Sequence, residues 1–284
     1  MLRTRLWMGA LLILLALGVL GFDNRLAPVY PLLLVLLLIL SAAASYELTS
    51  LLDPVRRPNP FPTTLAVWLV LISNWLPHFL SVEHPWLGHD PWHWVLAAMV
   101  VALLCAFLYE MATFRDAATS VERIALMFCS VAYLGFLASF FAQLRWLGAT
   151  PANGTCALLL AIFVPKCGDI GAYFAGRRFG RRPMAPVLSP KKTWEGASGG
   201  VAASVIAAIV IDRALPSMLN GILAEIGFGI TVGVAGMLGD LAESLIKRAG
   251  QFKDASQSVP GFGGFLDVLD AIIFAAPVAY AWLA

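Results

Sequence analysis

The residues whose types and spacing best suit a catalytic role lie between Gly239 and Asp270. Asp240, Ser244 and Lys247 stand at positions i, i+4 and i+7, so one helix face would carry a carboxylate, a hydroxyl and an ammonium group. Carboxylate oxygens are the ligands that Mg²⁺ prefers, and ammonium groups neutralise the charge of phosphates. This face therefore predicts metal-assisted phosphoryl chemistry.

A second pair of carboxylates opens the last apolar stretch of the chain. Asp267 and Asp270 lie three residues apart, which places them on one face of a helix. Acids are disfavoured in an apolar helix, so their presence indicates a function. The loop before them carries Lys253, Asp254 and several glycines, and it would let two helices return side by side. An ordinary polar turn at a membrane surface is the alternative explanation.

Two charges also lie inside an apolar run, at Lys166 and Asp169. A charge at the centre of a bilayer costs about 2.5–3.5 kcal/mol on insertion scales, so these side chains are expected to pair or to line a wet cavity. Their spacing of three residues puts them on one helix face. A purely structural ion pair is the alternative.

The connection that follows this run is basic and has two parts. Its four arginines between residues 177 and 182 are typical of a segment that binds anionic lipid headgroups. Farther on, Lys191, Lys192 and Thr193 supply two cations and a hydroxyl just before the next helix. Lysines and the N–H groups of a helix start can together bind a phosphate, so this second part is a candidate phosphate-binding segment.

Nine apolar stretches would have to position these residues. A bilayer core about 30 Å thick needs roughly 20 apolar residues in a helix, and such a segment must be helical because lipid offers no partner to an open backbone. The nine stretches are residues 6–22, 27–48, 63–80, 92–110, 125–144, 157–175, 197–211, 222–241 and 265–283. The sequence thus predicts an all-α, polytopic transmembrane bundle of about nine helices.

The lysines and arginines are distributed very unevenly over the connections between these stretches. Of the 19, fifteen fall on the side of the N-terminus, three fall on the other side, and Lys166 lies within a helix. Because cytoplasmic loops carry the excess of positive charge, we expect a cytoplasmic N-terminus and an outward C-terminus. The basic and acidic candidates would then face the cytoplasm.

The composition excludes several classes of protein. Only 13% of the residues are charged and 60% are hydrophobic, whereas a soluble domain has about 25% charged residues. We therefore expect a single membrane domain over residues 1–284, with N-terminal helices in 1–150 and a catalytic half in 151–284. The net charge of +2 does not suggest a nucleic-acid binder. The four cysteines lack the paired spacing of zinc or redox sites and are expected to be structural.

Two further polar features are weaker signals. His84, His89 and His93 gather in an outward connection, but the tryptophans beside them favour a polar interfacial loop over a metal site. Glu47 lies near the cytoplasmic end of the second stretch, where it could reach the interface or join the site.

The segment that ends at Asp270 resembles the signature of the phosphatidate cytidylyltransferases, also called CDP-diacylglycerol synthases. In that signature a serine is followed by Lys-Arg, Lys-Asp, Pro-x-His-Gly-Gly and Asp-Arg-x-Asp. The matching residues are Ser244, Lys247, Arg248, Lys253, Asp254, Pro260, Gly263, Gly264, Asp267 and Asp270. Residues 169–180 and 189–200 also resemble family segments, as do Tyr46 and Glu47.

The resemblance implies transfer of a cytidylyl group from CTP to phosphatidic acid, which gives CDP-diacylglycerol and pyrophosphate and requires Mg²⁺. The implied catalytic residues are Asp240, Ser244, Lys247, Arg248, Lys253 and Asp267, the metal ligands are Asp240, Asp267 and Asp270, and the nucleotide-binding residues are Lys191, Lys192, Thr193, Asp169 and Asp254. The expected location is the inner (plasma) membrane, among membrane lipids, with the site facing the cytoplasm. A homodimer is compatible with the sequence.

Two departures from the signature and two other functions have to be weighed. Phe262 stands where the signature has His, and Val268 where it has Arg. A related CTP-dependent kinase of polyprenol-type lipids would also need acids, lysines and a membrane bundle. A secondary transporter could use the intramembrane charges as a substrate path, but the sequence shows no internal repeat and its polar residues gather at one membrane face.

Overall fold

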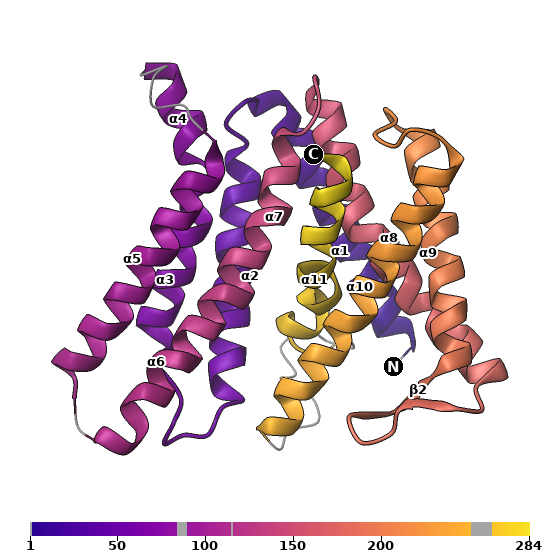
Figure 1. The fold of residues 1–284 in the computed structure, drawn as a ribbon. Coiled ribbons are helices and arrows are strands. Elements are labelled where there is room, and N and C mark those ends of the chain that lie inside the picture. The colour runs from indigo at the N-terminus through magenta and orange to yellow at the C-terminus, as the bar shows by residue number, and fades with distance from the viewer. Residues whose placement is uncertain (1, 84–89, 115, 251–262) are drawn as a thin grey trace. The chain divides into compact units, whose positions relative to one another are not determined.

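The structure is a computed structural model that describes residues 2–83, 90–114, 116–250 and 263–284. Within these residues the regular secondary structure is helical except for a short two-stranded sheet (Figure 1). It divides into two compact units. The first comprises Met1–Gln143 and Gly250–Leu266, and the second comprises Leu144–Ala249 and Asp267–Ala284.

The first unit is built from the helices of the N-terminal half. Its helices are α1 (Leu2–Asp23), α2 (Pro31–Ser50), α3 (Pro60–Ser73), α4 (Leu76–Glu83), α5 (Pro91–Ala112), α6 (Ala117–Val131) and α7 (Leu137–Gln143), with a π-helical turn at Ala132–Phe136 between the last two. Helices α2, α3 and α5 begin with a proline, whose fixed φ suits the first helical position. The side chains of Asn59, Asp90 and Asp116 cap α3, α5 and α6 by accepting backbone N–H bonds.

A buried polar network ends α3 early. The side-chain amide of Asn74 donates to two carbonyl oxygens in the last turn of α3 and to Oγ of Ser139, and it accepts from Nε2 of Gln143. Such bonds compete with the helical backbone ladder. The stretch 63–80, predicted as one membrane segment, is therefore two helices, and α3 has only 14 residues.

The second unit contains the site. Its elements are α8 (Pro151–Phe179), β1 (Pro183–Ala185), β2 (Ser189–Thr193), α9 (Trp194–Ala214), α10 (Ile222–Ala249) and all but the first two residues of α11 (Phe265–Leu283). The two strands form an antiparallel hairpin in which Pro183 lies opposite Thr193 and Ala185 opposite Ser189. The sequence analysis did not predict this hairpin.

Glycines allow α8 and α9 to approach each other closely. A Cβ atom at Gly171 would collide with Cβ of Ala203, and one at Gly199 would collide with Cβ of Ala175. Small residues at such positions let helix backbones come together in membranes, where packing rather than hydrophobicity holds helices to one another. Figure 1 shows α8, α9 and α10 side by side, and all three pairs of these helices are in contact.

The expected fold class is confirmed, with one difference in the helix count. Eight helical segments among the described residues are long and apolar enough to cross a membrane, and the ninth expected segment is represented by the shorter α3. Each of the other eight predicted stretches coincides with one of these segments. The cytoplasmic N-terminus and the single-domain organisation stay predictions.

Candidate active site

Three carboxylates from two helices of the second unit form an acidic cluster. Asp240 and Glu243 lie one turn apart on α10, Asp270 lies on α11, and one oxygen of each is within 4.8 Å of the others. The close approach of the two helices depends on Gly239, because a Cβ atom there would collide with the carbonyl oxygen of Asp270. Glu243 and Asp270 are buried, and Asp240 is half-buried.

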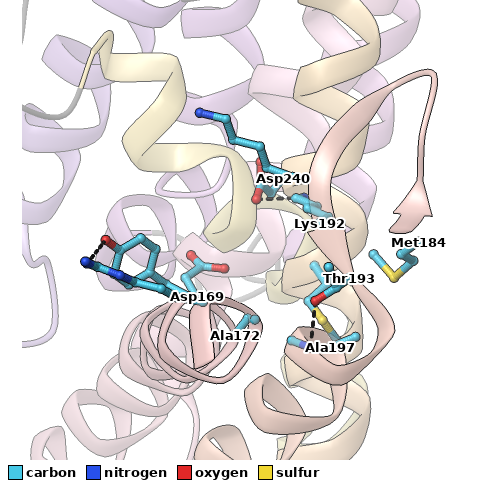
Figure 2. A pocket seen from close by; sticks show the side chains of 13 residues that line it. Asp169, Ala172, Met184, Lys192, Thr193, Ala197 and Asp240 are labelled. Atoms are coloured by element: carbon cyan, nitrogen blue, oxygen red, sulfur yellow. Dashed lines mark hydrogen bonds and ion pairs between the residues drawn. The ribbon is translucent and has the colours of Figure 1, made fainter. Parts of the chain in front are cut away.

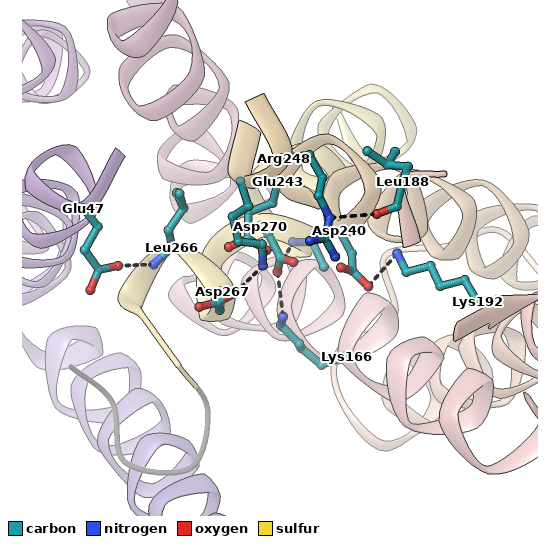
Figure 3. A network of polar contacts seen from close by, with 12 residues as sticks. Glu47, Lys166, Leu188, Lys192, Asp240, Glu243, Arg248, Leu266, Asp267 and Asp270 are labelled. Carbon is teal, nitrogen blue, oxygen red and sulfur yellow. Dashed lines mark hydrogen bonds and ion pairs between the residues drawn. The ribbon is translucent and has the colours of Figure 1, made fainter. Parts of the chain in front are cut away.

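Lys166 on α8 binds two carboxylates of this region. Its Nζ atom lies 3.2 Å from Oδ1 of Asp270 (Figure 3) and 3.5 Å from Oδ2 of Asp169. The pairing with Asp169 is the one expected for two charges at helical spacing in an apolar run. Lys166 thus links the charges of α8 to the acidic cluster.

Lys247 binds a second pair of carboxylates. Its Nζ atom is 2.8 Å from Oε2 of Glu243 and 2.7 Å from Oδ1 of Asp267. Glu243 precedes it by one turn of α10, whereas Asp267 comes from the first turn of α11. Lys247 therefore crosslinks the two helices that carry the acidic cluster.

The β-hairpin contributes the third lysine. Lys192 on β2 places its Nζ atom 2.7 Å from Oδ2 of Asp240 (Figures 2 and 3). The hairpin is anchored to the start of α9 by Glu195, whose Oε2 atom accepts the backbone N–H groups of Arg181 and Arg182. This anchoring and the strand pairing hold the lysine against α10.

The charges of the site do not balance. Among the described residues, the ion pairs of this site join five carboxylates to three ammonium groups, which gives a formal charge of −2 when every carboxylate is ionised. In addition, Oε1 of the buried Glu243 has no hydrogen-bond partner among those residues. Burying unpaired negative charge is costly. Oxygen ligands with excess negative charge fit a hard divalent cation such as Mg²⁺.

A cavity of about 420 Å³ lies within the second unit (Figure 2). It is lined by parts of α8, the hairpin, the start of α9 and α10. The lining residues are Asp169, Ala172, Tyr173, Gly176, Arg177, Met184, Lys191, Lys192, Thr193, Gly196, Ala197, Met237 and Asp240. The volume is within the range of small-molecule sites, about 300–1,000 Å³.

The structure brings most of the predicted site residues of this unit together. Asp240, Asp267 and Asp270 belong to the network of ion pairs, and Lys191, Lys192, Thr193 and Asp169 line the cavity. Ser244 is half-buried on α10, and Nε of the exposed Arg248 donates to the Leu188 carbonyl at 3.5 Å. Lys253 and Asp254 lie outside the described residues.

Thr193 has a structural role that the sequence analysis did not assign. Its Oγ1 atom accepts the N–H of Gly196 at 3.1 Å and so caps α9. A capping hydroxyl stabilises a helix whether or not a ligand is bound. Its position in the cavity wall also leaves it beside any ligand there.

Sequence reasoning missed one residue of the site and left the role of Glu47 open. Glu243 belongs to the acidic cluster, and its spacing of three residues from Asp240 was an available signal. Glu47, which the sequence left undecided, accepts the backbone N–H of Leu266 through Oε2 at 3.0 Å within the first unit (Figure 3). Leu266 directly precedes Asp267, so Glu47 satisfies a backbone donor at the start of α11.

Eight long apolar segments among the described residues, with a buried charged site in one unit, define a multi-pass membrane protein. The chain belongs to the cytidylyltransferase family, whose sequence model matches residues 1–284. This agrees with the resemblance found in the signature segment.

Several curated relatives carry the name phosphatidate cytidylyltransferase. The chloroplastic phosphatidate cytidylyltransferase 5 of Arabidopsis thaliana is 30% identical over 265 residues, which are 86% of this chain and 63% of the relative. The enzyme of Synechocystis sp. is 31% identical over 244 residues, 76% of this chain and 75% of the relative. That of Pseudomonas aeruginosa is 43% identical over 134 residues, 46% of this chain and 48% of the relative. The chain thus spans about half to three quarters of the length of these relatives.

Proposed function

We propose that the protein transfers a cytidylyl group from CTP to phosphatidic acid. A phosphate oxygen of the lipid attacks the α-phosphorus of CTP, the bond from that phosphorus to the β-phosphate oxygen breaks, and CDP-diacylglycerol and pyrophosphate are formed. The observation that carries the proposal is the acidic cluster with its three lysines beside a cavity, in a chain of the cytidylyltransferase family.

The carboxylates would hold the metal. Asp240, Glu243 and Asp270 each have an oxygen in the acidic cluster and are the ligands that this geometry favours, whereas Asp267, also predicted from the sequence, does not belong to that cluster. Bound Mg²⁺ supplies positive charge to the phosphate oxygens in the transition state.

The lysines would bind and orient the phosphates. Lys192 lies at the cavity beside Asp240, where it can neutralise the triphosphate, with Lys191 on the same strand. Lys247 is fixed by Glu243 and Asp267, so its charge is already in place when pyrophosphate develops. Such preorganised charge is usually the largest contribution to catalysis of this kind.

The proposal includes an orientation and a location. The excess of lysine and arginine on the side of residues 177–192 and 247–253 supports a site that faces the cytoplasm, in the inner membrane of a bacterial cell. The lipid substrate would enter from the membrane, and CTP from the cytoplasm. A homodimer stays a prediction.

The test uses purified protein in detergent with phosphatidic acid, Mg²⁺ and CTP labelled at either the α- or the γ-phosphate. We expect the α-label to enter the lipid fraction and the γ-label to leave as pyrophosphate. Entry of the γ-label into a polyprenol-type lipid would show a kinase instead, and uptake into vesicles without CTP would show a transporter. EDTA should abolish labelling, and Asp240→Ala is the inactive control because it removes a candidate metal ligand.

A further inference from the structure

Two cavity residues have no part in the phosphate chemistry described above. Tyr173 and Arg177 lie one turn apart on α8, and both line the cavity that also contains Lys192 and Asp240. Nη1 of Arg177 donates to the Tyr173 hydroxyl oxygen at 3.2 Å. The sequence grouped Arg177 with its neighbours as a binder of lipid headgroups, but its position in the cavity wall distinguishes it from Arg178.

The pair presents a defined pattern of hydrogen-bonding groups. A guanidinium group carries five N–H donors in a planar fork, of which Nη1 has one directed to the phenol. The phenol oxygen keeps a second lone pair as an acceptor. Side by side, the two groups can therefore offer donor, donor and acceptor.

This order is complementary to one nucleobase edge. The Watson–Crick edge of cytosine offers acceptor, acceptor and donor through O2, N3 and the exocyclic amine. Uracil replaces the N3 acceptor by an N–H donor, so its contact with the guanidinium would become repulsive, and it replaces the amine by a carbonyl, so the bond from the amine to the phenol oxygen would be lost. A planar fork that binds two adjacent acceptors is also how arginine reads base edges in nucleic acids.

The remainder of the cavity fits the rest of the nucleotide. Lys191 and Lys192 provide cations for phosphates, and Asp240 belongs to the acidic cluster. At the cavity wall α8 and α9 approach each other closely, because a Cβ atom at Gly196 would lie 3.0 Å from the Ala172 carbonyl oxygen. One cavity thus contains two lysines that can bind phosphates, and it contains Tyr173 and Arg177, which can form hydrogen bonds to a base.

We propose that Tyr173 and Arg177 bind the cytosine ring of CTP and determine the choice of CTP over UTP. This proposal rests on the proposed function, since it assigns the base subsite of the same reaction. It identifies the ligand by its edge of two adjacent acceptors and one donor.

Nucleotide binding without turnover is the direct test. Binding of CTP and of UTP to the detergent-solubilised full chain is measured by calorimetry with Mg²⁺ and without phosphatidic acid. We expect wild type to prefer CTP, and Arg177→Gln to lose about tenfold or more of that preference through weaker CTP binding. Tyr173→Phe removes the acceptor and should also reduce the preference.

Arg178→Gln is the matched control, because Arg178 is exposed and is not among the residues that line the cavity. It should bind both nucleotides as wild type does. An Arg177→Gln variant that keeps the full preference for CTP would overturn the proposal. So would a rise in KM for phosphatidic acid with unchanged CTP binding, because the arginine would then hold the lipid phosphate.

The experiments distinguish a failure of the proposed reaction from a failure of the proposed base subsite. A wild-type protein that prefers CTP in binding but transfers no label to lipid would refute the reaction and leave the base subsite intact. A variant that is still active, but accepts UTP and CTP equally, would support both.

Discussion

The Nζ atom of Lys192 lies 2.7 Å from Oδ2 of Asp240, and this ion pair joins the β-hairpin to α10 at the acidic cluster. The hairpin is therefore held next to the candidate metal ligands by a residue that also lines the cavity. In the proposed reaction the same ammonium group neutralises negative charge on the triphosphate. The positions of Lys192 on the hairpin and of Asp240 on α10 therefore depend on each other.

Replacing Lys192 by Met should lower kcat about 100-fold, because one preorganised cation is lost from the transition state. The measurement is transfer of the α-label from CTP to lipid, with thermal unfolding to show that the variant is folded. Arg182→Met is the control, since the exposed Arg182 contacts Glu195 through its backbone N–H. Equal rates for Lys192→Met and wild type would exclude the lysine from the site.

Glu243 should bind the divalent cation. Its Oε1 atom is buried and has no hydrogen-bond partner among the described residues, while Oε2 contacts Lys247. Glu243→Gln keeps the size but removes the charge, so Mn²⁺ affinity measured by electron paramagnetic resonance should fall about tenfold or more. Unchanged affinity would assign Glu243 a purely structural role.

The matched control for this substitution is Glu225→Gln. Glu225 is also buried and lies on the same helix, but it pairs with Arg213 through contacts of 3.1 Å and 3.2 Å rather than joining the acidic cluster. Its replacement should lower stability and leave Mn²⁺ affinity at the wild-type value. A similar loss of affinity in both variants would indicate a general effect on folding.

The sequence predicted which charged residues gather at the candidate site better than it predicted the contacts among them. Helical spacing placed Asp240, Ser244 and Lys247 on one face of α10, but it could not show that Lys247 binds Asp267. That contact depends on how closely α10 and α11 approach, which is decided by the absence of a side chain at Gly239. Such pairing between distant segments has no periodic signal in a single chain.

The β-hairpin was missed for a different reason. Its strands have three and five residues, contain prolines and carry no alternation of apolar and polar side chains. The pairing is supported by Glu195, which binds the backbone at Arg181 and Arg182 across the hairpin. In contrast, the long apolar helices were predictable, because the length required to cross a bilayer is fixed.

Close packing of α8 against α9 should be sensitive to the size of residue 199. Gly199→Ala places a Cβ atom against Ala175 and should destabilise the protein by about 1–3 kcal/mol, measured as a lower midpoint of thermal unfolding in detergent. Gly18→Ala is the control, since a Cβ atom there meets nothing within 4 Å. It should be neutral or stabilising by about 0.5–1 kcal/mol. Equal midpoints for the two variants would contradict the close contact.

The last prediction concerns the two departures from the family signature. Phe262 lies outside the described residues, and Val268 is half-buried on α11. Val268 is about 100° around the helix from Asp267 and farther from Asp270, so an arginine there would point away from the face that those two share. The ion pairs that carry the proposed chemistry are formed without either signature residue.

We therefore expect the wild-type chain to be active. Phe262→His and Val268→Arg, singly or together, should change the rate of label transfer by less than about tenfold, which corresponds to less than about 1.4 kcal/mol in the barrier. The assay compares wild type, both single variants and the double variant at equal amounts of folded protein. If only the double variant formed lipid-linked nucleotide, the chain would be a lapsed enzyme whose charged network serves the structure alone.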